Sequence, residues 1–111
     1  MKVIVLLAVV ALVSAQENLE QAIADPAKLQ GLVDCFLDRA PCSDGPAGFK
    51  EMTPKALETS CGNCNPAQRH LANVFFGALQ KNLPNEFDNF VNKYDPSRQH
   101  IDSFLQSIQG A

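Results

Sequence analysis

The sequence predicts an all-α protein, a compact bundle of about six short helices, and three observations support this fold class. A capping residue stands directly before a proline at four places: Asp25-Pro26, Thr53-Pro54, Asn65-Pro66 and Asp95-Pro96. Leu83-Pro84 has the proline without a capping residue. Apolar residues then recur at helical spacing, and almost no stretch alternates between apolar and polar residues as a strand does.

The capping residues give a physical reason for a helix start at each of these places. Asp, Thr and Asn side chains accept hydrogen bonds from the free amide groups of the first turn of a helix. Proline at the next position loses nothing, because its missing N–H would have had no partner. We therefore expect helices to begin at five positions: Pro26, Pro54, Pro66, Pro84 and Pro96.

In the first half of the chain, a weak helix is expected over residues 18–24. A stronger one follows Pro26, where the helically spaced apolar residues are Leu29, Leu32, Val33, Phe36, Leu37 and Ala40. Residues 49–57 are predicted to be helical with a break at Pro54. Residues 43–48, Ser-Asp-Gly-Pro-Ala-Gly, form the clearest predicted loop.

In the second half, the same spacing predicts three more helices. The apolar positions are Leu71, Val74, Phe75, Ala78 and Leu79 after Pro66, Phe87, Phe90, Val91 and Tyr94 after Pro84, and Ile101, Phe104, Leu105 and Ile108 after Pro96. No internal repeat or long linker interrupts the pattern. Residues 16–111 are therefore expected to form a single helical domain.

The first residues predict secretion. Met1-Lys2 gives a positive start, residues 3–13 are an unbroken apolar run, and Ser14-Ala15 gives small side chains for a signal peptidase. The run is too short to span a bilayer, and polar residues follow it at once. We expect a signal peptide over residues 1–15 and an extracellular protein without a membrane span.

The charged residues argue against several classes of partner. The net charge is −3, and acidic and basic residues are scattered without a basic run. Nucleic acid, heparin and anionic membrane surfaces are therefore poor partner candidates. A monomer is expected.

Four cysteines, Cys35, Cys42, Cys61 and Cys64, predict two disulfides with three possible pairings. Each close pair lies at a helix boundary, so pairing of Cys35 with Cys42 and of Cys61 with Cys64 is the simplest connectivity. Loop closure gives about 2.5 kcal/mol for the first ring and about 2 kcal/mol for the second. Such disulfides would fix the angle between adjacent helices.

Two chemical alternatives exist for Cys61-x-x-Cys64. A thiol oxidoreductase could use it, because the start of the following helix would lower a thiol pKa, but thioredoxin-like motifs follow a strand and none is predicted. A zinc site would need all four cysteines, or this pair with His70 and another ligand, which an oxidising compartment disfavours. We expect structural disulfides and no metal.

No other catalytic group is evident. His70 and His100 are expected on or near polar helix faces, and spacing places no serine or acidic partner beside them. Acidic residues occur singly, so no carboxylate pair stands out. The sequence therefore predicts a protein that is not an enzyme and needs no cofactor.

The cysteine spacing Cys35-x6-Cys42-x18-Cys61-x2-Cys64 resembles that of the arthropod chemosensory proteins, the OS-D family. "VDCFLDRAPC" (33–42) resembles that family's "VDCLLDxGPC", and "ALETSCGNC" (56–64) its "ALExxCxxC". Gln68 stands where the family has a glutamine, and "NKYDP" (92–96) resembles its "xKYDP". Phe87 stands where the family typically has a tryptophan.

The resemblance implies a secreted bundle of about six helices around an internal apolar channel, with the first cysteine joined to the second and the third to the fourth. It also implies a carrier of small hydrophobic ligands of fatty-acid, odorant or pheromone type. A developmental or defence protein that acts on a protein or membrane partner is the alternative. The ligand-binding residues are expected from two grounds, their positions on apolar helix faces and this resemblance. They are Leu29, Val33, Phe36, Leu71, Val74, Phe75, Phe87, Phe90 and Tyr94.

Overall fold

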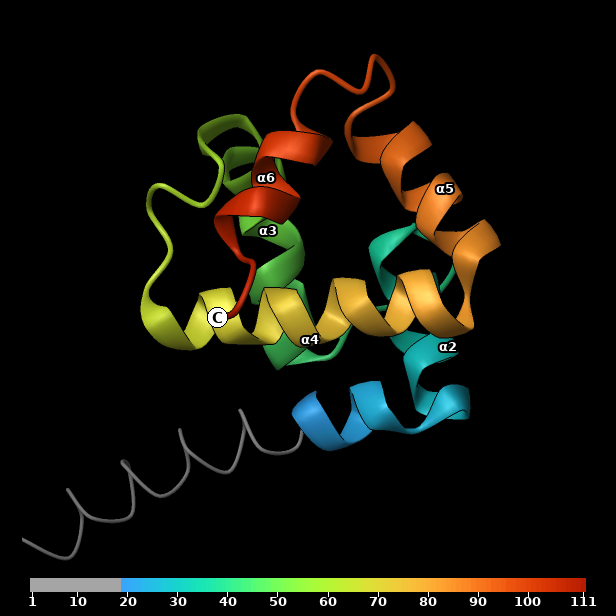
Figure 1. Ribbon diagram of the computed structural model, residues 1–111. Coiled ribbons are helices and arrows are strands. Elements are labelled where there is room, and N and C mark those ends of the chain that lie inside the picture. Colours follow the sequence, from blue (N-terminus) through green and yellow to red (C-terminus); the bar gives the residue numbers. More distant parts are fainter. Residues whose placement is uncertain (1–18) are drawn as a thin grey trace, which may run out of the picture.

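The computed structural model describes residues 19–111, all of whose regular structure is helical (Figure 1). Residues 19–24 form a short helix. It is followed by α2 (Pro26–Phe36), α3 (Asp44–Thr59), α4 (Pro66–Asn82), α5 (Pro84–Tyr94) and α6 (Ile101–Ser107). The all-α prediction is confirmed, whereas the predicted signal peptide over residues 1–15 lies outside the described residues.

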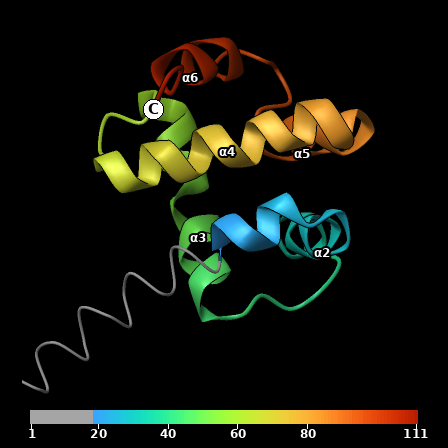
Figure 2. The same cartoon turned by 60° about the horizontal axis from the view of Figure 1, so that its bottom comes forward.

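Helix α4 is the central element of the bundle. In both views it lies between residues 19–24 on one side and α6 on the other (Figures 1 and 2). It packs against α5, while α3 contacts both α2 and α6, and α2 also contacts α5. These contacts connect the helices in the order α4, α5, α2, α3 and α6.

Three of the five predicted helix starts are confirmed. The carboxylate of Asp25 accepts a hydrogen bond from the amide of Ala27 at 3.0 Å, and α2 begins at Pro26. Asn65 and Gln68 form a reciprocal capping box at the start of α4, and α5 begins at Pro84 without a side-chain cap. Proline at the first helical position therefore marks a start even where the preceding residue is leucine.

The prediction for residues 43–57 is wrong in two respects. Helix α3 begins at Asp44, inside the segment expected to be a loop, and continues through Pro54 without a break. Thr53 caps nothing, because its hydroxyl donates to the carbonyl oxygen of Phe49 at 2.8 Å, one turn earlier in the same helix. Burial of one face of α3 outweighs the helix-breaking tendency of Pro54.

The boundaries of two other helices also differ from the prediction. Helix α2 ends at Phe36 rather than near Ala40, and Asp38 lies in the left-handed region with φ 61°. Helix α6 begins at Ile101 rather than at Pro96. The carboxylate of Asp95 nevertheless stabilises that start from a distance, because it accepts hydrogen bonds from the amides of His100 at 3.0 Å and Ile101 at 2.8 Å.

Aromatic side chains form the centre of the core. Phe76 makes edge-on contacts with the rings of Phe75, Phe90 and Phe104, at centroid distances of 5.2, 5.1 and 5.3 Å. Leu29, Val33, Leu79, Phe90, Val91 and Ile108 are among the most deeply buried side chains. Within residues 19–111, no helix is long and apolar enough to cross a membrane.

Candidate functional site

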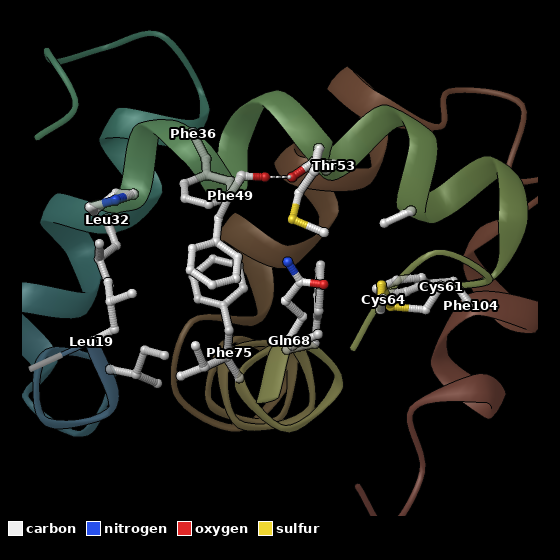
Figure 3. A pocket seen from close by; sticks show the side chains of 17 residues that line it. Leu19, Leu32, Phe36, Phe49, Thr53, Cys61, Cys64, Gln68, Phe75 and Phe104 are labelled. Carbon is white, nitrogen blue, oxygen red and sulfur yellow. Dashed lines mark hydrogen bonds between the residues drawn. A yellow bond between two sulfur atoms is a disulfide. The ribbon is translucent and has the colours of Figure 1, made fainter. Parts of the chain in front are cut away.

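An apolar cavity of about 80 Å³ lies between α3 and α4 (Figure 3). Residues 19–24 and α2 close one end, and the second disulfide with α6 closes the other. Its lining residues are Leu19, Ile23, Leu32, Phe36, Pro46, Phe49, Met52, Thr53, Ala56, Cys61, Cys64, Gln68, Leu71, Ala72, Phe75, Phe76 and Phe104. Nearly all of these side chains are apolar, so the cavity suits a hydrophobic molecule.

Helical periodicity places the two long walls of the cavity. Phe49, Met52, Thr53 and Ala56 on α3 recur at the spacing that lines one helix face. Gln68, Leu71, Ala72, Phe75 and Phe76 do the same on α4. Ala56 and Ala72 project little into the space, and their short side chains leave room between two helices that otherwise present large residues.

One wall of the cavity is part of the aromatic core. The ring of Phe36 stacks on that of Phe75 at a centroid distance of 5.3 Å, and both rings line the cavity. Phe90 lies behind them, 6.1 Å from Phe36 and 6.2 Å from Phe75, and does not line it. Phe36 and Phe75 thus form an aromatic layer: a ligand in the cavity would touch one side of it, and the other side packs against Phe90.

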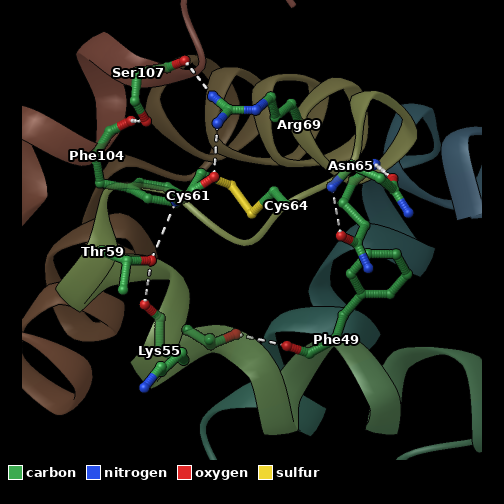
Figure 4. The surroundings of a disulfide bond; sticks show 12 residues. Phe49, Lys55, Thr59, Cys61, Cys64, Asn65, Arg69, Phe104 and Ser107 are labelled. Atoms are coloured by element: carbon green, nitrogen blue, oxygen red, sulfur yellow. Dashed lines mark hydrogen bonds between the residues drawn. A yellow bond between two sulfur atoms is a disulfide. The ribbon is translucent and has the colours of Figure 1, made fainter.

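The second disulfide joins Cys61 to Cys64 at the end of the cavity, in the connection between α3 and α4 (Figure 4). Cys61 is 1% exposed and has a left-handed φ of 63°. The guanidinium of Arg69 donates to the carbonyl oxygens of Cys61 at 2.7 Å and of Ser107 at 3.0 Å. This side chain joins the disulfide connection to the end of α6.

The first disulfide joins Cys35 to Cys42, so both bonds have the local pairing expected from the cysteine positions. It links the last turn of α2 to the segment before α3 and does not line the cavity. Among the described residues, no group of three or more histidine, cysteine or acidic side chains could hold a metal ion.

Charged groups lie outside the cavity and connect helices. The Arg39 guanidinium, bound to Glu86 at 2.6 Å, lowers the pKa of that carboxyl from 4.5 to about 2, with help from Gln30. Lys50 and Lys93 both pair with Asp38 and lower its pKa to about 2. These pairs link the segment after α2 to α3 and α5, and the hydrogen bond from Gln30 to Glu86 links α2 itself to α5.

The two histidines make polar contacts outside the cavity. His70 is exposed on α4, where its ring contacts the carboxylate of Glu20 and its Nδ1 lies 3.2 Å from the carbonyl oxygen of Ala111. His100 lies just before α6 rather than on a helix, and its amide donates to Asp95. Neither histidine lines the cavity.

Three of the nine expected ligand-binding residues line the cavity: Phe36, Leu71 and Phe75. Leu29, Val33 and Phe90 are buried in the core elsewhere. Val74, Phe87 and Tyr94 are half-buried and pack against that core, and the Tyr94 hydroxyl donates to the Phe36 carbonyl oxygen at 2.5 Å. Contact of those six residues with a ligand stays a prediction.

Sequence reasoning missed most of the lining, and above all the wall that α3 supplies. Phe49, Met52 and Ala56 follow helical spacing, which becomes visible once residues 44–59 are treated as one helix. Leu19 and Ile23 show the same spacing in a helix that was expected to be weak. The cysteines and Gln68 were recognised for other reasons, and no sequence signal places them beside a cavity.

A small helical bundle with two local disulfides and an apolar cavity is a fold suited to holding a small hydrophobic molecule. Residues 15–102 match the family described as "Insect pheromone-binding family, A10/OS-D". This match covers more than half of the chain, so the chain belongs to that family, and its description is of a binding protein.

Three curated insect proteins are similar to this chain. Allergen Tha p 1 of Thaumetopoea pityocampa is 27% identical over 81 residues, or 73% of this chain. Ejaculatory bulb-specific protein 3 of Drosophila melanogaster is 26% identical over 69% of the chain, and the putative odorant-binding protein A10 of that species is 27% identical over 71%. The matched segments span 64, 61 and 51% of these relatives' own lengths.

Proposed function

We propose that this protein is a secreted carrier that binds small hydrophobic molecules, of fatty-acid, odorant or pheromone type, in the cavity between α3 and α4. The observation that supports this most strongly is the lining, which is apolar except for Thr53 and Gln68. Membership of a family described as pheromone-binding supports the same function. The predicted signal peptide and the two disulfides support secretion.

The energetics allow such binding. Burial of about ten methylene groups at about 0.8 kcal/mol each gives about 8 kcal/mol before ordering costs. Micromolar affinity needs about that much. A carrier forms no covalent bond with its cargo, so this reversible burial is the whole mechanism.

The cavity must widen to hold a long chain. Its volume of about 80 Å³ is below the roughly 300–1,000 Å³ that is typical of ligand sites. Phe49 and Met52 are half-buried and line it, so their side chains can turn outward when a ligand enters. We expect the ligand to part α3 from α4 and leave the aromatic layer in place.

An enzymatic use of Cys61 and Cys64 fits the geometry less well. Thiol–disulfide exchange needs an accessible sulfur, whereas Cys61 is 1% exposed and Cys64 is half-buried. Both residues line the cavity. We infer that this disulfide shapes the binding site.

A cavity-filling substitution tests the carrier function. Ala72→Leu adds three carbon atoms to the cavity wall and should lower the affinity for dodecanol at least tenfold, because the ligand loses its space. Displacement of the apolar fluorophore N-phenyl-1-naphthylamine by dodecanol measures this affinity. Ala67→Leu adds the same atoms elsewhere on α4 and is the matched control. Circular dichroism should show both variants folded. Equal affinities in the two folded variants would place the ligand outside this cavity.

A further inference from the structure

The capping box at the start of α4 fixes the orientation of the Gln68 side-chain amide. Its Oε1 accepts from the backbone amide of Asn65 at 2.9 Å, and its own backbone amide donates to the Asn65 side chain at 2.8 Å. The backbone N–H of Asn65 can only donate, so the Gln68 atom that faces it must be the oxygen. The other terminal atom is therefore the NH₂ group.

This NH₂ group is available to a ligand. Gln68 lines the cavity, and Figure 3 shows its amide nitrogen directed into the space opposite α3. No acceptor among residues 19–111 receives a hydrogen bond from it. Since no buried side-chain polar atom in this range lacks a partner, the nitrogen is accessible to solvent in the absence of a ligand. The cavity therefore contains a donor group whose orientation is fixed by hydrogen bonds with Asn65, a residue that does not line the cavity.

The other polar side chain in the lining has a different role. Thr53 uses its hydroxyl hydrogen in the bond to the Phe49 carbonyl oxygen, so it offers the cavity a lone pair and no donor. Among the described residues, no acidic, basic or histidine side chain lines the cavity. A ligand carboxylate would find no cation to offset its desolvation there.

We propose, resting on the carrier function proposed above, that the cavity selects neutral molecules with a long apolar body and a hydrogen-bond-accepting head. An ester, aldehyde or ketone carbonyl fits this description, and Gln68 is the residue that recognises it. A carboxylate is disfavoured because its charge must be buried without a counter-ion, so among the fatty-acid-type molecules proposed above the cavity favours neutral derivatives such as esters. The capping box already uses the backbone amides of Asn65 and Gln68, so these do not serve an anion at this helix end.

Three ligands of equal chain length test the head-group selection. Methyl dodecanoate, dodecanoate and dodecane would each displace bound N-phenyl-1-naphthylamine from the whole protein at pH 8. We expect the ester to bind at least about tenfold more tightly than the carboxylate. Equal binding of ester and carboxylate would overturn the selection. If none of the three displaces the fluorophore, the carrier function itself fails.

Gln68→Glu tests the role of the donor. The new carboxylate can still accept from the Asn65 amide, so the cap and the melting temperature should be retained, but the cavity loses both N–H donors. The affinity ratio of methyl dodecanoate to dodecane should fall about three- to tenfold, as expected for one lost hydrogen bond. The ratio cancels any general effect of the new charge on apolar ligands.

Two further variants separate the donor from general polarity. Gln68→Met removes the donors without adding charge, and the same ratio should fall to a similar extent. Thr53→Val removes the other polar atom of the lining and should change the ratio less than twofold, because Thr53 has no hydrogen to give the carbonyl. An equal loss in Thr53→Val and in the Gln68 variants, or no loss in either Gln68 variant, refutes the assignment of Gln68.

Discussion

At the scale of single residues, Asp95 shows how one buried charge can organise a segment. It is 3% exposed, and its carboxylate holds the amides of His100 and Ile101 at the start of α6. Burial raises its pKa, but these backbone hydrogen bonds together lower the pKa by more than burial raises it. The pKa therefore lies below its ordinary value of 3.8. The charge is therefore tolerated because the backbone solvates it.

We predict that Asp95→Ala lowers the free energy of unfolding by about 2 to 3 kcal/mol, because two amides at the start of α6 lose a charged acceptor. The stabilisation is present above the ordinary pKa and is lost as the pH falls through the lower pKa of the folded state. Urea unfolding from pH 7 to pH 3 measures both effects. Asp102→Ala, exposed in the first turn of α6, should cost less than about 1 kcal/mol.

Glu86 gives a second pH-dependent prediction. Arg39 and Gln30 lower its pKa from 4.5 to about 2, so its contribution to stability is complete above about pH 4.5 and disappears toward pH 2. Glu86→Gln should therefore reduce the loss of stability that the protein shows between these pH values. Asp88→Asn, exposed on the same helix, should leave that pH dependence nearly unchanged. Identical acid curves for both variants would contradict the assignment.

At the scale of elements, α3 contains a proline that its packing overrides. Pro54 lies inside α3 and is exposed, and it cannot donate to the carbonyl oxygen of Lys50 one turn earlier. We predict that Pro54→Ala raises the free energy of unfolding by about 1 to 3 kcal/mol, because the helix regains this hydrogen bond. Pro66→Ala, at the first position of α4, should give no such gain. Thermal unfolding of both variants measures the difference.

Helix starts were predictable where a cap and a proline act together, as at Asp25-Pro26 and Asn65-Pro66. The same signature failed at Thr53-Pro54, because local sequence does not report that both sides of the proline bury one continuous face. It also failed at Asp95-Pro96, where the carboxylate caps a helix that begins at Ile101. Tertiary packing decided both cases.

The candidate site was less predictable than the fold. Apolar periodicity identifies buried faces, and it correctly marked Phe36 and Phe75, but it does not say whether a buried face meets another helix or a cavity. Phe90 and Phe75 have the same pattern, yet Phe90 is core and Phe75 lines the space. That distinction depends on the small residues opposite, such as Ala56, and on how the helices cross.

At the scale of the whole molecule, the two disulfides are both local and lie in different surroundings. Each joins residues close in sequence, with Cα atoms 5.0 Å apart. Cys61 and Cys64 line the cavity, whereas Cys35 and Cys42 do not. Each bond should contribute about 2 to 2.5 kcal/mol to stability through loop closure. Stability alone therefore does not distinguish them, but ligand affinity should.

We predict that the double substitution Cys61→Ala with Cys64→Ala lowers dodecanol affinity at least threefold, because the end of the cavity loses both its sulfur contacts and its fixed connection. The double substitution Cys35→Ala with Cys42→Ala is the matched control. It should lower the melting temperature by a similar amount and leave affinity per folded molecule unchanged, since that bond lies away from the lining. Titrations well below both melting temperatures make this comparison. An equal loss of affinity in both variants would mean that the bundle as a whole, rather than the cavity end at Cys61 and Cys64, controls ligand binding.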